Sequence, residues 1–436
     1  MAAAGLDRVT ADARRPLRTA EVLAIGSELL GSARLDTNSL FIADQLSSIG
    51  IELRAKAVVG DNRREVSELL RGALARVDVV VVSGGLGPTD DDVTRDAVAD
   101  VFNVRLIEDP AITESLRQRF ERRGLTMPEV NRRQAMVLDG GVVLANPNGT
   151  APGQMFERNG QIVFLLPGPP RELKPMLEAV VATVLTPRVG AERLYRRTLF
   201  VTGRGESHVE EIAQPIYSRW LASTPPIETT ILASPGQIEL HLVMRSADAA
   251  TAADTLDRAR DDLAAALGPD VFSLDGRSME EILGELLRER GLTIAAAESC
   301  TGGLMMSRLT DVPGSSDYVA GGVVVYSNEL KTALAGVDAG LIAAHGAVSE
   351  PVAVALAEGI KVRTGASIGV GITGIAGPTG GTPQKPVGTV CIAAVMPDGA
   401  AQVRTFSLFG NRAMIKFWSA QYAMNMVRRL LTPAAG

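Results

Sequence analysis

Two adjacent residues with nucleophilic side chains, Ser299 and Cys300, lie where a predicted strand meets a predicted helix. The surrounding sequence is Ala297-Glu-Ser-Cys-Thr-Gly-Gly303, in which the strand over 292–297 ends and a helix begins at Thr301. Such a turn exposes a small nucleophile at a helix N-terminus, where backbone amides can stabilise an oxyanion. The pattern therefore indicates covalent catalysis, with either side chain as the nucleophile.

A serine nucleophile needs a base, and the chain contains only three histidines, none of them near Ser299 in the sequence. A buried lysine with a lowered pKa can accept the proton instead. Lys331 is the natural candidate, because it follows Tyr326 on a helix expected over 328–334. Plainer roles are the alternatives: Ser299 as a helix N-cap and Tyr326 at the edge of the core. For Lys331, residue types alone favour a solvated side chain.

A long loop rich in Gly, Pro and Thr, Thr373–Thr389, follows the strand expected over 367–372. Its free amides and hydroxyl groups could hold a phosphate and a ribose. Arg412 opens the last helix, expected over 412–431, and its guanidinium could form a fork with a phosphate. A plain loop and a solvent-facing arginine are the alternatives.

A second glycine-rich segment, Ser83-Gly-Gly-Leu-Gly-Pro-Thr-Asp-Asp-Asp-Val-Thr94, also joins an apolar strand to a helix. In open α/β sheets, ligands bind beyond the carboxyl ends of the strands, where glycine amides and helix N-termini attract anions. Consecutive aspartates can supply oxygen ligands to a divalent cation. The segment therefore favours a metal-bridged phosphate or pyrophosphate, and a tight turn with acidic N-capping residues is the alternative. Two further Pro- and Gly-rich loops, 146–153 and 166–173, lie near predicted strands.

Strands and helices alternate in the first part of the chain, which predicts an α/β fold with a parallel sheet covered on both faces. Strands are expected over 21–26, 51–59, 77–82 and 162–166, and helices over 38–49, 63–76, 111–123 and 171–185. The run Val79–Val82 is apolar at every position, as in a strand buried on both sides.

The sequence changes character near Pro187, where a small α+β domain is expected. Its predicted strands are 197–202, 229–233 and 237–244, its helices are 207–220 and 247–267, and 270–277 is expected to be a linker. Strands and helices alternate again in the third part, whose first helix is expected to be capped by Ser278. The predicted organisation is a disordered extension over 1–19 and domains over 20–175, 176–275 and 276–436.

Composition excludes several classes of protein. The 436 residues are 46 % apolar and 22 % charged, as in ordinary globular domains. The net charge of −6 argues against direct nucleic-acid binding. Two cysteines cannot form a disulfide framework, which favours the cytoplasm, and no segment has the ~18 uninterrupted apolar residues of a membrane span. We therefore expect a cytoplasmic protein with neither membrane nor nucleic acid as a partner.

Residues 21–175 resemble the three-layer molybdopterin-binding fold of MoaB- and MogA-type proteins. The segment Gly84–Thr94 resembles that family's signature, with Leu86 in place of a threonine and Asp91 in place of an arginine. This version, together with Pro-Gly-Pro-Pro-x-Glu-Leu in 167–173 and Glu28-Leu-Leu, resembles the competence/damage-inducible CinA family. That resemblance implies an ADP-ribose pyrophosphatase dependent on a divalent metal of unknown identity.

Asp92 falls on the functional aspartate of the signature, and Asp61 falls near its second acidic position. The expected metal ligands are Asp61, Asp91 and Asp92. The expected contacts to the substrate in this domain are Gly84, Gly85, Gly87 and Thr89.

Residues 278–436 resemble the C-terminal CinA domain, the nicotinamide mononucleotide deamidase called PncC. The matching segments are Glu298–Gly303, Val312–Ser316, Tyr326–Lys331, His345–Glu350, Thr373–Pro378 and Gly388-Thr389. The resemblance implies Ser299 as nucleophile, Lys331 as base and Tyr326 as an assisting residue, with no cofactor. The expected substrate contacts are Thr301, Gly302, Gly303, Thr373, Gly374, Gly377 and Arg412. Asn411 stands where that family commonly has an acidic residue.

We therefore expect a hydrolase of pyridine nucleotide recycling that converts nicotinamide mononucleotide and water to nicotinic acid mononucleotide and ammonia, with ADP-ribose as the substrate of a second site. The resemblance also implies a homodimer and a KH-type middle domain, which lacks a clear basic Gly-x-x-Gly loop for RNA. The alternative is a non-catalytic nucleotide- or pterin-binding N-terminal module in a competence-linked scaffold.

Overall fold

The computed structural model describes residues 16–32 and 34–432. The chain divides into two compact units: the first extends to Tyr195 and includes Arg245–Thr251, and the second comprises Arg196–Met244 and the chain from Ala252. Most of the extension predicted over 1–19 lies outside the described residues. Its last residues are ordered, contrary to the prediction, because the buried Leu17 pairs with Val189 and Thr19 begins the first strand.

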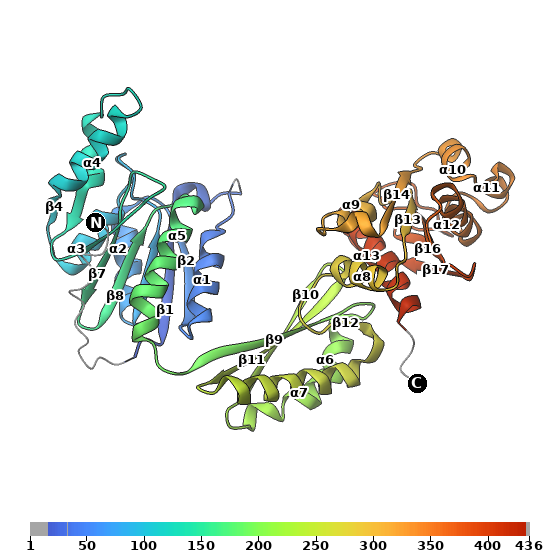
Figure 1. Ribbon diagram of the computed structural model, residues 1–436, viewed down its shortest axis with the longest axis horizontal. Coiled ribbons are helices and arrows are strands. Elements are labelled where there is room, and N and C mark those ends of the chain that lie inside the picture. The colour runs from blue at the N-terminus through green and yellow to red at the C-terminus, as the bar shows by residue number, and fades with distance from the viewer. Residues whose placement is uncertain (1–15, 33, 433–436) are drawn as a thin grey trace. The chain divides into compact units, whose positions relative to one another are not determined.

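The first unit contains a six-stranded sheet in the order β2-β1-β3-β8-β7-β6 (Figure 1). β1, β2, β3 and β8 pair in parallel, while β7 and β6 add antiparallel strands at one edge. These strands are β1 (Thr19–Ile25), β2 (Glu52–Val59), β3 (Val79–Ser83), β6 (Val142–Leu144), β7 (Gly153–Arg158) and β8 (Gln161–Leu166). The sheet is therefore mixed, and only its first four strands have the predicted parallel pairing.

Helices cover both faces of this sheet, as the sequence predicts. Val79 and Val81 face one core with α1 (Asn38–Ser48) and α5 (Pro170–Val180). Val80 and Val82 face the other core with α2 (Arg63–Leu74) and α3 (Thr94–Phe102). Because successive side chains of a strand point to opposite faces, the apolar run of β3 fills both cores. A small two-stranded sheet of β4 (Leu106–Glu108) and β5 (Met136–Leu138) lies beyond α3, together with α4 (Pro110–Glu121).

The boundary predicted at 175/176 falls inside α5. Leu173, Met176, Leu177 and Val180 are buried on one face of this helix, in the same core as α1. The following π-helical turn, Val181–Leu185, adds further side chains to that core. The first domain therefore extends beyond 175, because the apolar face of the helix is continuous across that position.

The second unit begins with an α+β region, as predicted. Its four-stranded sheet has the order β10-β11-β9-β12, and two helices accompany it (Figure 1). The elements are β9 (Arg193–Val201), α6 (Glu206–Tyr217), β10 (Ile227–Ser234), β11 (Gln237–Ser246), α7 (Ala249–Leu267) and β12 (Val271–Ser273). The prediction of a linker over 270–277 is wrong for its first half, which contains a strand: β12 pairs with β9, and Phe272 is buried against Phe200.

The rest of the second unit has a five-stranded sheet in the order β14-β13-β15-β16-β17. β13 (Ile294–Glu298) pairs in parallel with β14 (Val319–Val324) and β15 (Ile368–Gly374), and β16 (Thr389–Val395) and β17 (Ala401–Ser407) follow antiparallel. One face is covered by α8 (Met279–Glu289), α9 (Leu304–Thr310) and α13 (Arg412–Leu431). The other face is covered by α10 (Asn328–Ala335), α11 (Ala339–His345) and α12 (Glu350–Thr364). The sequence did not predict α11.

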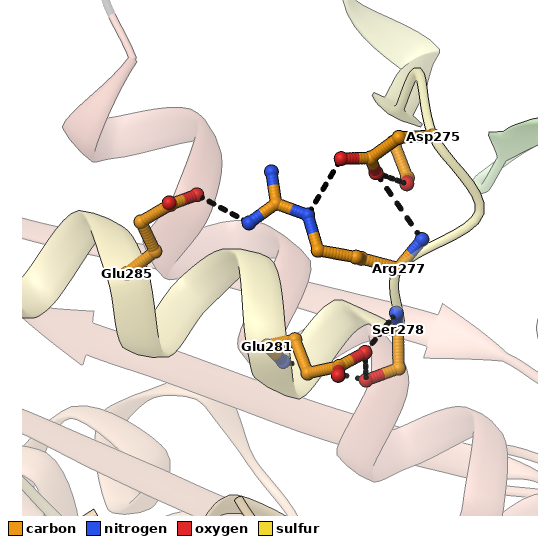
Figure 2. A network of polar contacts seen from close by, with 6 residues as sticks. Asp275, Arg277, Ser278, Glu281 and Glu285 are labelled. Atoms are coloured by element: carbon orange, nitrogen blue, oxygen red, sulfur yellow. Dashed lines mark hydrogen bonds and ion pairs between the residues drawn. The ribbon is translucent and has the colours of Figure 1, made fainter. Parts of the chain in front are cut away.

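The start of α8 is fixed by local polar contacts (Figure 2). Ser278 Oγ accepts the amide of Glu281, and the Glu281 carboxylate accepts the amide of Ser278, which completes a capping box. Arg277 bridges Asp275 and Glu285, with N–O distances of 2.7 Å to each. The predicted N-cap at Ser278 is therefore confirmed. Within the described residues, no helix is both long enough and apolar enough to cross a membrane.

Candidate functional site

Ser299 lies directly after β13, which pairs with β14 on one side and β15 on the other, and its side chain is buried. Its amide donates to the carbonyl of Ile372 on β15 at 2.9 Å, which extends the sheet pairing by one residue. The chain then turns sharply, and the Gly302 amide donates back to the Ser299 carbonyl at 3.1 Å. The hydroxyl is therefore held on a strand-to-helix turn, where the sequence predicts it.

Lys331 reaches Ser299 from α10 and is almost completely buried, with 2 % of its surface exposed. Its Nζ lies 3.2 Å from Ser299 Oγ, 3.0 Å from the Val325 carbonyl and 3.3 Å from the Tyr326 carbonyl. Burial lowers the pKa of Lys331, since the charged ammonium loses its hydration there. A neutral amine at hydrogen-bonding distance from a hydroxyl can accept its proton, so the geometry provides a nucleophile and a base.

Cys300, the other candidate nucleophile, neighbours Ser299. Its thiol is buried, and burial raises its pKa to about 12. A thiol reacts as its thiolate, so a raised pKa removes the reactive form at neutral pH. Of the two candidates that the sequence leaves open, the geometry favours Ser299.

The turn after Cys300 presents backbone amides. Gly302 and Gly303 have φ of 64° and 90°, conformations that favour glycine. The amides of Thr301 and Gly303 donate to no backbone carbonyl among the described residues. These groups lie at the start of α9, where the helix dipole also favours negative charge. Thr301 is fully buried, and its Oγ1 has no hydrogen-bond partner within the described part of the chain.

Glu298 orients this turn, although the sequence did not single it out as a site residue. Its carboxylate is buried and accepts the amides of Met305 at 3.2 Å and Met306 at 2.9 Å. It thus satisfies amides in the first turn of α9 from the residue before Ser299. The sequence signal was its position beside the nucleophile, on an otherwise apolar strand.

Tyr326 and Arg412 contact each other. The Tyr326 hydroxyl accepts from Arg412 Nη2 at 2.9 Å, and Arg412 Nη1 donates to the Gly377 carbonyl at 2.8 Å. Tyr326 is 59 % exposed and touches Lys331 through its backbone carbonyl. Its hydroxyl makes no hydrogen bond to Ser299 or Lys331 in the described structure, so its predicted assisting role rests on the backbone and on Arg412.

Thr373 and Gly374 end β15, the strand beside Ser299. The Thr373 side chain is buried, and its hydroxyl donates to the Ala347 carbonyl at 2.8 Å. A Cβ added at Gly374 would lie 3.0 Å from Cys300 Sγ and 2.7 Å from a methyl of Val390. The glycine therefore allows the two turns to approach closely, and Thr373 fixes the loop that carries Ala347.

The predicted site residues of the first unit line one cavity of about 370 Å³ at the carboxyl ends of β1 and β3. All the expected residues are present there: Asp61, Gly84, Gly85, Gly87, Thr89, Asp91 and Asp92. The loops 146–153 and 166–173 also reach it, through Thr150, Ala151 and Pro167–Pro169. Glu28, Gln134 and Glu172 are further lining residues that sequence reasoning did not assign to the site.

Asp92 holds the glycine-rich loop together. Its carboxylate accepts the Gly87 amide at 2.7 Å, the Thr89 amide at 2.9 Å and the Thr89 hydroxyl at 2.6 Å. A Cβ at Gly87 would lie 2.4 Å from the same carboxylate, so glycine is required there. The buried Arg95 donates to the carbonyls of Leu86 and Gly87 and closes the other side of the loop.

Comparison with known proteins matches the two ends of the chain to two different families. Residues 21–187 match the family described as a probable molybdopterin binding domain, and residues 276–431 match the CinA C-terminal domain. A CinA-like protein of Koribacter versatilis is 48 % identical over 417 residues, which cover 94 % of this chain and 99 % of the relative. A putative competence-damage inducible protein of Symbiobacterium thermophilum is 43 % identical and covers 94 % and 98 %.

The chain belongs to the CinA family. Among solved structures, the competence/damage inducible protein CihA from Agrobacterium tumefaciens shares 36 % identity over 37 % of this chain and 99 % of its own, with a TM-score of 0.34. The family resemblance and the α/β fold class predicted from the sequence are both confirmed.

In this CinA-family protein, the three aspartates expected to bind a metal do not form a three-carboxylate site. Within the described ranges, no group of three or more His, Cys, Asp or Glu side chains could hold a metal ion. Asp92 is turned into its own loop, whereas Asp61 accepts the Ser27 amide through Oδ2 and Asp91 is exposed. Mg²⁺ often takes only one or two carboxylates, with phosphate and water completing its shell. Of the three aspartates, Asp61 and Asp91 are the carboxylates whose contacts would leave them able to hold such a cation.

One further positively charged side chain of this CinA-family protein, that of Lys416, lies by the turn that follows Ser299. A Cβ added at Gly302 would lie 3.5 Å from Lys416 Nζ, one turn of α13 after Arg412. The sequence placed Arg412 at the site, and the helical i, i+4 spacing of Lys416 was the signal that could have found the second cation. Because residues four apart lie on one face of a helix, Arg412 and Lys416 share one side of α13, and Lys416 lies beside the turn at Gly302.

Proposed function

We propose that the C-terminal domain hydrolyses the carboxamide of nicotinamide mononucleotide to nicotinic acid mononucleotide and ammonia. The observation that carries this proposal is the contact of 3.2 Å between Lys331 Nζ and Ser299 Oγ, with the lysine buried and its pKa lowered. A nucleophile with its own base suits acyl transfer. The specific amide is taken from the family resemblance, and the cations Arg412 and Lys416 suit its phosphate.

Neutral Lys331 accepts the Ser299 proton as Oγ attacks the amide carbon. The amides of Thr301 and Gly303 stabilise the oxyanion that forms. When the tetrahedral intermediate collapses, the carbon–nitrogen bond breaks and Lys331 returns the proton to the departing ammonia, which leaves an ester on Ser299. Water then attacks that ester, Lys331 takes the water proton and returns it to Oγ, and the acid is released. No cofactor is required in this sequence.

The direct test is ammonia release from nicotinamide mononucleotide by the full chain and by Ser299→Ala. We expect the variant to lose activity by about 1,000-fold or more, because it has no nucleophile. Binding of the substrate, measured by calorimetry, should persist and shows that the variant is folded. Full activity in Ser299→Ala would refute the mechanism, and binding without turnover in the unaltered chain would refute the proposed reaction.

We propose that the cavity of the first unit hydrolyses the pyrophosphate of ADP-ribose with a divalent cation. Its glycine amides, its position beyond the strand ends and its carboxylates support this activity. When bound, the cation would neutralise charge on the pyrophosphate oxygens. Asp61 and Asp91 would hold it, and the loop fixed by Asp92 would orient the phosphates.

The competing function for this cavity is binding of a nucleotide or pterin without turnover. It is favoured by Asp92, whose carboxylate accepts hydrogen bonds from Gly87 and Thr89 of its own loop and so stabilises the loop. Incubation with ADP-ribose and Mg²⁺, Mn²⁺ or Co²⁺ separates the two. Formation of AMP that disappears in Asp91→Asn supports hydrolysis. Saturable binding without AMP under any of these metals supports the binding module.

We also propose a cytoplasmic location and a homodimeric state for this CinA-family protein. Both cysteines are free and buried, which suits a reducing compartment. The dimer rests on the family resemblance and is tested by light scattering of the purified chain; a monomer at micromolar concentration would refute it.

A further inference from the structure

The second unit contains another cavity, which the proposed deamidase chemistry does not use. It encloses about 760 Å³ and lies between β17, the second half of α13 and the loop 203–205 of the α+β region. None of the residues predicted for the deamidase site lines it. Its volume is within the range of small-molecule sites in proteins, ~300–1,000 Å³.

The charge of this cavity is positive. Arg204, Arg404 and Arg429 line it, against a single lining carboxylate, Asp270. Asp270 pairs with both Arg204 and Arg429, the latter at 3.3 Å. Arg404 forms no ion pair within the described residues, and its guanidinium lies 4.9 Å from the centre of the Phe406 ring. The arginines outnumber the carboxylate, so an anion in this cavity would be attracted.

Aromatic rings form the rest of the lining. Phe406 and Tyr422 are stacked with centroids 4.9 Å apart, and Trp418 meets Tyr422 edge-on at 5.6 Å. The buried Nε1 of Trp418 has no hydrogen-bond partner in the described part of the chain. Phe409 also lines the cavity and is 86 % exposed, which is unusual for so large an apolar side chain. Phe406 is already stacked between Tyr422 and Arg404, so Phe409 is the lining ring that is exposed to a planar group.

We propose that this cavity binds a nucleotide, with its phosphates on the arginines and its base against the aromatic rings. Two simpler ligands fit the lining less well. Phosphate alone would leave the exposed ring of Phe409 uncovered, and an apolar ligand would bury the Arg404 guanidinium without a counter-charge. A nucleotide supplies both a polyanion and a planar ring, and bases stack on aromatic side chains whatever their sequence. This site goes beyond the proposed function, because neither reaction requires it.

The chain provides a local reporter for the test, since its two tryptophans are Trp220 and Trp418. In Trp220→Phe, all tryptophan emission comes from Trp418 in the cavity, and the first unit contains no tryptophan. We expect ADP to change this emission saturably. Adenosine, which lacks phosphate, and inorganic pyrophosphate, which lacks a base, should each bind about tenfold more weakly or worse.

Arg404→Gln in the same background should weaken ADP binding by about tenfold. Its control is Arg290→Gln, an exposed arginine at the end of α8 that does not line the cavity, which should leave the titration unchanged. Arg412→Ala should also leave the ADP titration unchanged, because Arg412 belongs to the proposed deamidase site. The Arg404 side chain is exposed, so equal melting temperatures for both arginine-to-glutamine variants would exclude misfolding.

Four results would overturn the proposal: no emission change with millimolar ADP, a change that Arg404→Gln leaves intact, equal binding of pyrophosphate and ADP, or emission that depends on protein concentration and not on ADP. The last result would mean that a second copy of the chain covers the cavity. Failure of the deamidase proposal is separate, because ammonia release is measured independently of this fluorescence.

Discussion

Both units place a glycine-rich turn between a buried strand and a helix, yet the neighbouring carboxylates act differently. In the first unit, Asp92 accepts amides of the turn itself, at Gly87 and Thr89. In the second, Glu298 accepts amides further on, at Met305 and Met306 in the first turn of α9. The first turn is therefore closed on its own carboxylate, whereas in the second the amides of Thr301 and Gly303 donate neither to Glu298 nor to a backbone carbonyl among the described residues. Two glycine-rich turns that both follow a buried strand therefore differ in which backbone amides the neighbouring carboxylate engages.

The largest expected effect comes from replacing Lys331, the proposed proton acceptor of Ser299 in the second unit. Lys331→Met should lower ammonia release by about 1,000-fold, because Ser299 loses its proton acceptor while an unbranched side chain fills the space. Release of ammonia under saturating substrate measures it. The matched control is Lys361→Met, a lysine of α12 that donates to the Met396 carbonyl, which should retain activity. Comparable losses in both variants would contradict a specific role for Lys331.

In the first turn, Asp92→Asn should abolish about 99 % of any AMP formation, since an amide nitrogen would face the loop amides. Loss of hydrogen bonds to a charged acceptor should also cost about 1.5–3 kcal/mol of unfolding free energy. Urea unfolding and AMP assays measure the two effects. Asp90→Asn is the control, because the fully exposed Asp90 makes only a surface ion pair with Arg133. Unchanged stability in Asp92→Asn would remove the distinction drawn between the two turns.

The pH profile tests the state of Lys331. Burial lowers its pKa, so the active neutral form is present above the folded-state value and is lost as pH falls through it. We expect the deamidation rate to rise about tenfold per pH unit below that pKa and then level off, below the ordinary titration range of lysine. The rate of the proposed ADP-ribose hydrolysis in the first unit, measured in parallel, should lack this transition. A deamidation profile that is flat where the enzyme remains folded would contradict lysine as the base.

Glu298→Gln should slow deamidation by about tenfold, because the side-chain amide cannot accept both helix amides and the turn would shift. Glu281→Gln is a matched control, since Glu281 also caps a helix N-terminus, that of α8, away from the nucleophile. Both variants should lose about 1 kcal/mol of stability, but only Glu298→Gln should lose rate. Equal rates in the two variants would show that Glu298 only stabilises the fold.

The smallest expected effect is that of Cys300→Ala. The thiol stays protonated, as its raised pKa of about 12 indicates, so its loss should change the deamidation rate by about twofold at most. Alkylation by iodoacetamide should be slow for the same reason. Complete loss of activity in this variant would transfer the nucleophile from Ser299 to Cys300.

The sequence by itself determined the features that depend on neighbouring residues. The cap at Ser278, the start of α13 at Arg412 and the glycine turns at 84–87 and 302–303 follow from local hydrogen bonds and allowed backbone angles. Local periodicity likewise predicted the four parallel strands of the first sheet, and the residues of the motifs carried the resemblance to the CinA family. The sequence could not decide whether Lys331 is a solvated or a buried residue, because its helix carries both kinds of position.

Only the tertiary structure decided which distant groups meet. Lys331 and Ser299 are joined across 32 residues by the packing of α10 beside β13, and that burial is what lowers the lysine pKa. β12 was missed because its three residues form a strand only by pairing with β9, and the boundary in α5 was misplaced because its apolar face continues past 175. Contacts, desolvation and long-range strand pairing depend on residues far apart in the chain, so local sequence signals do not contain them.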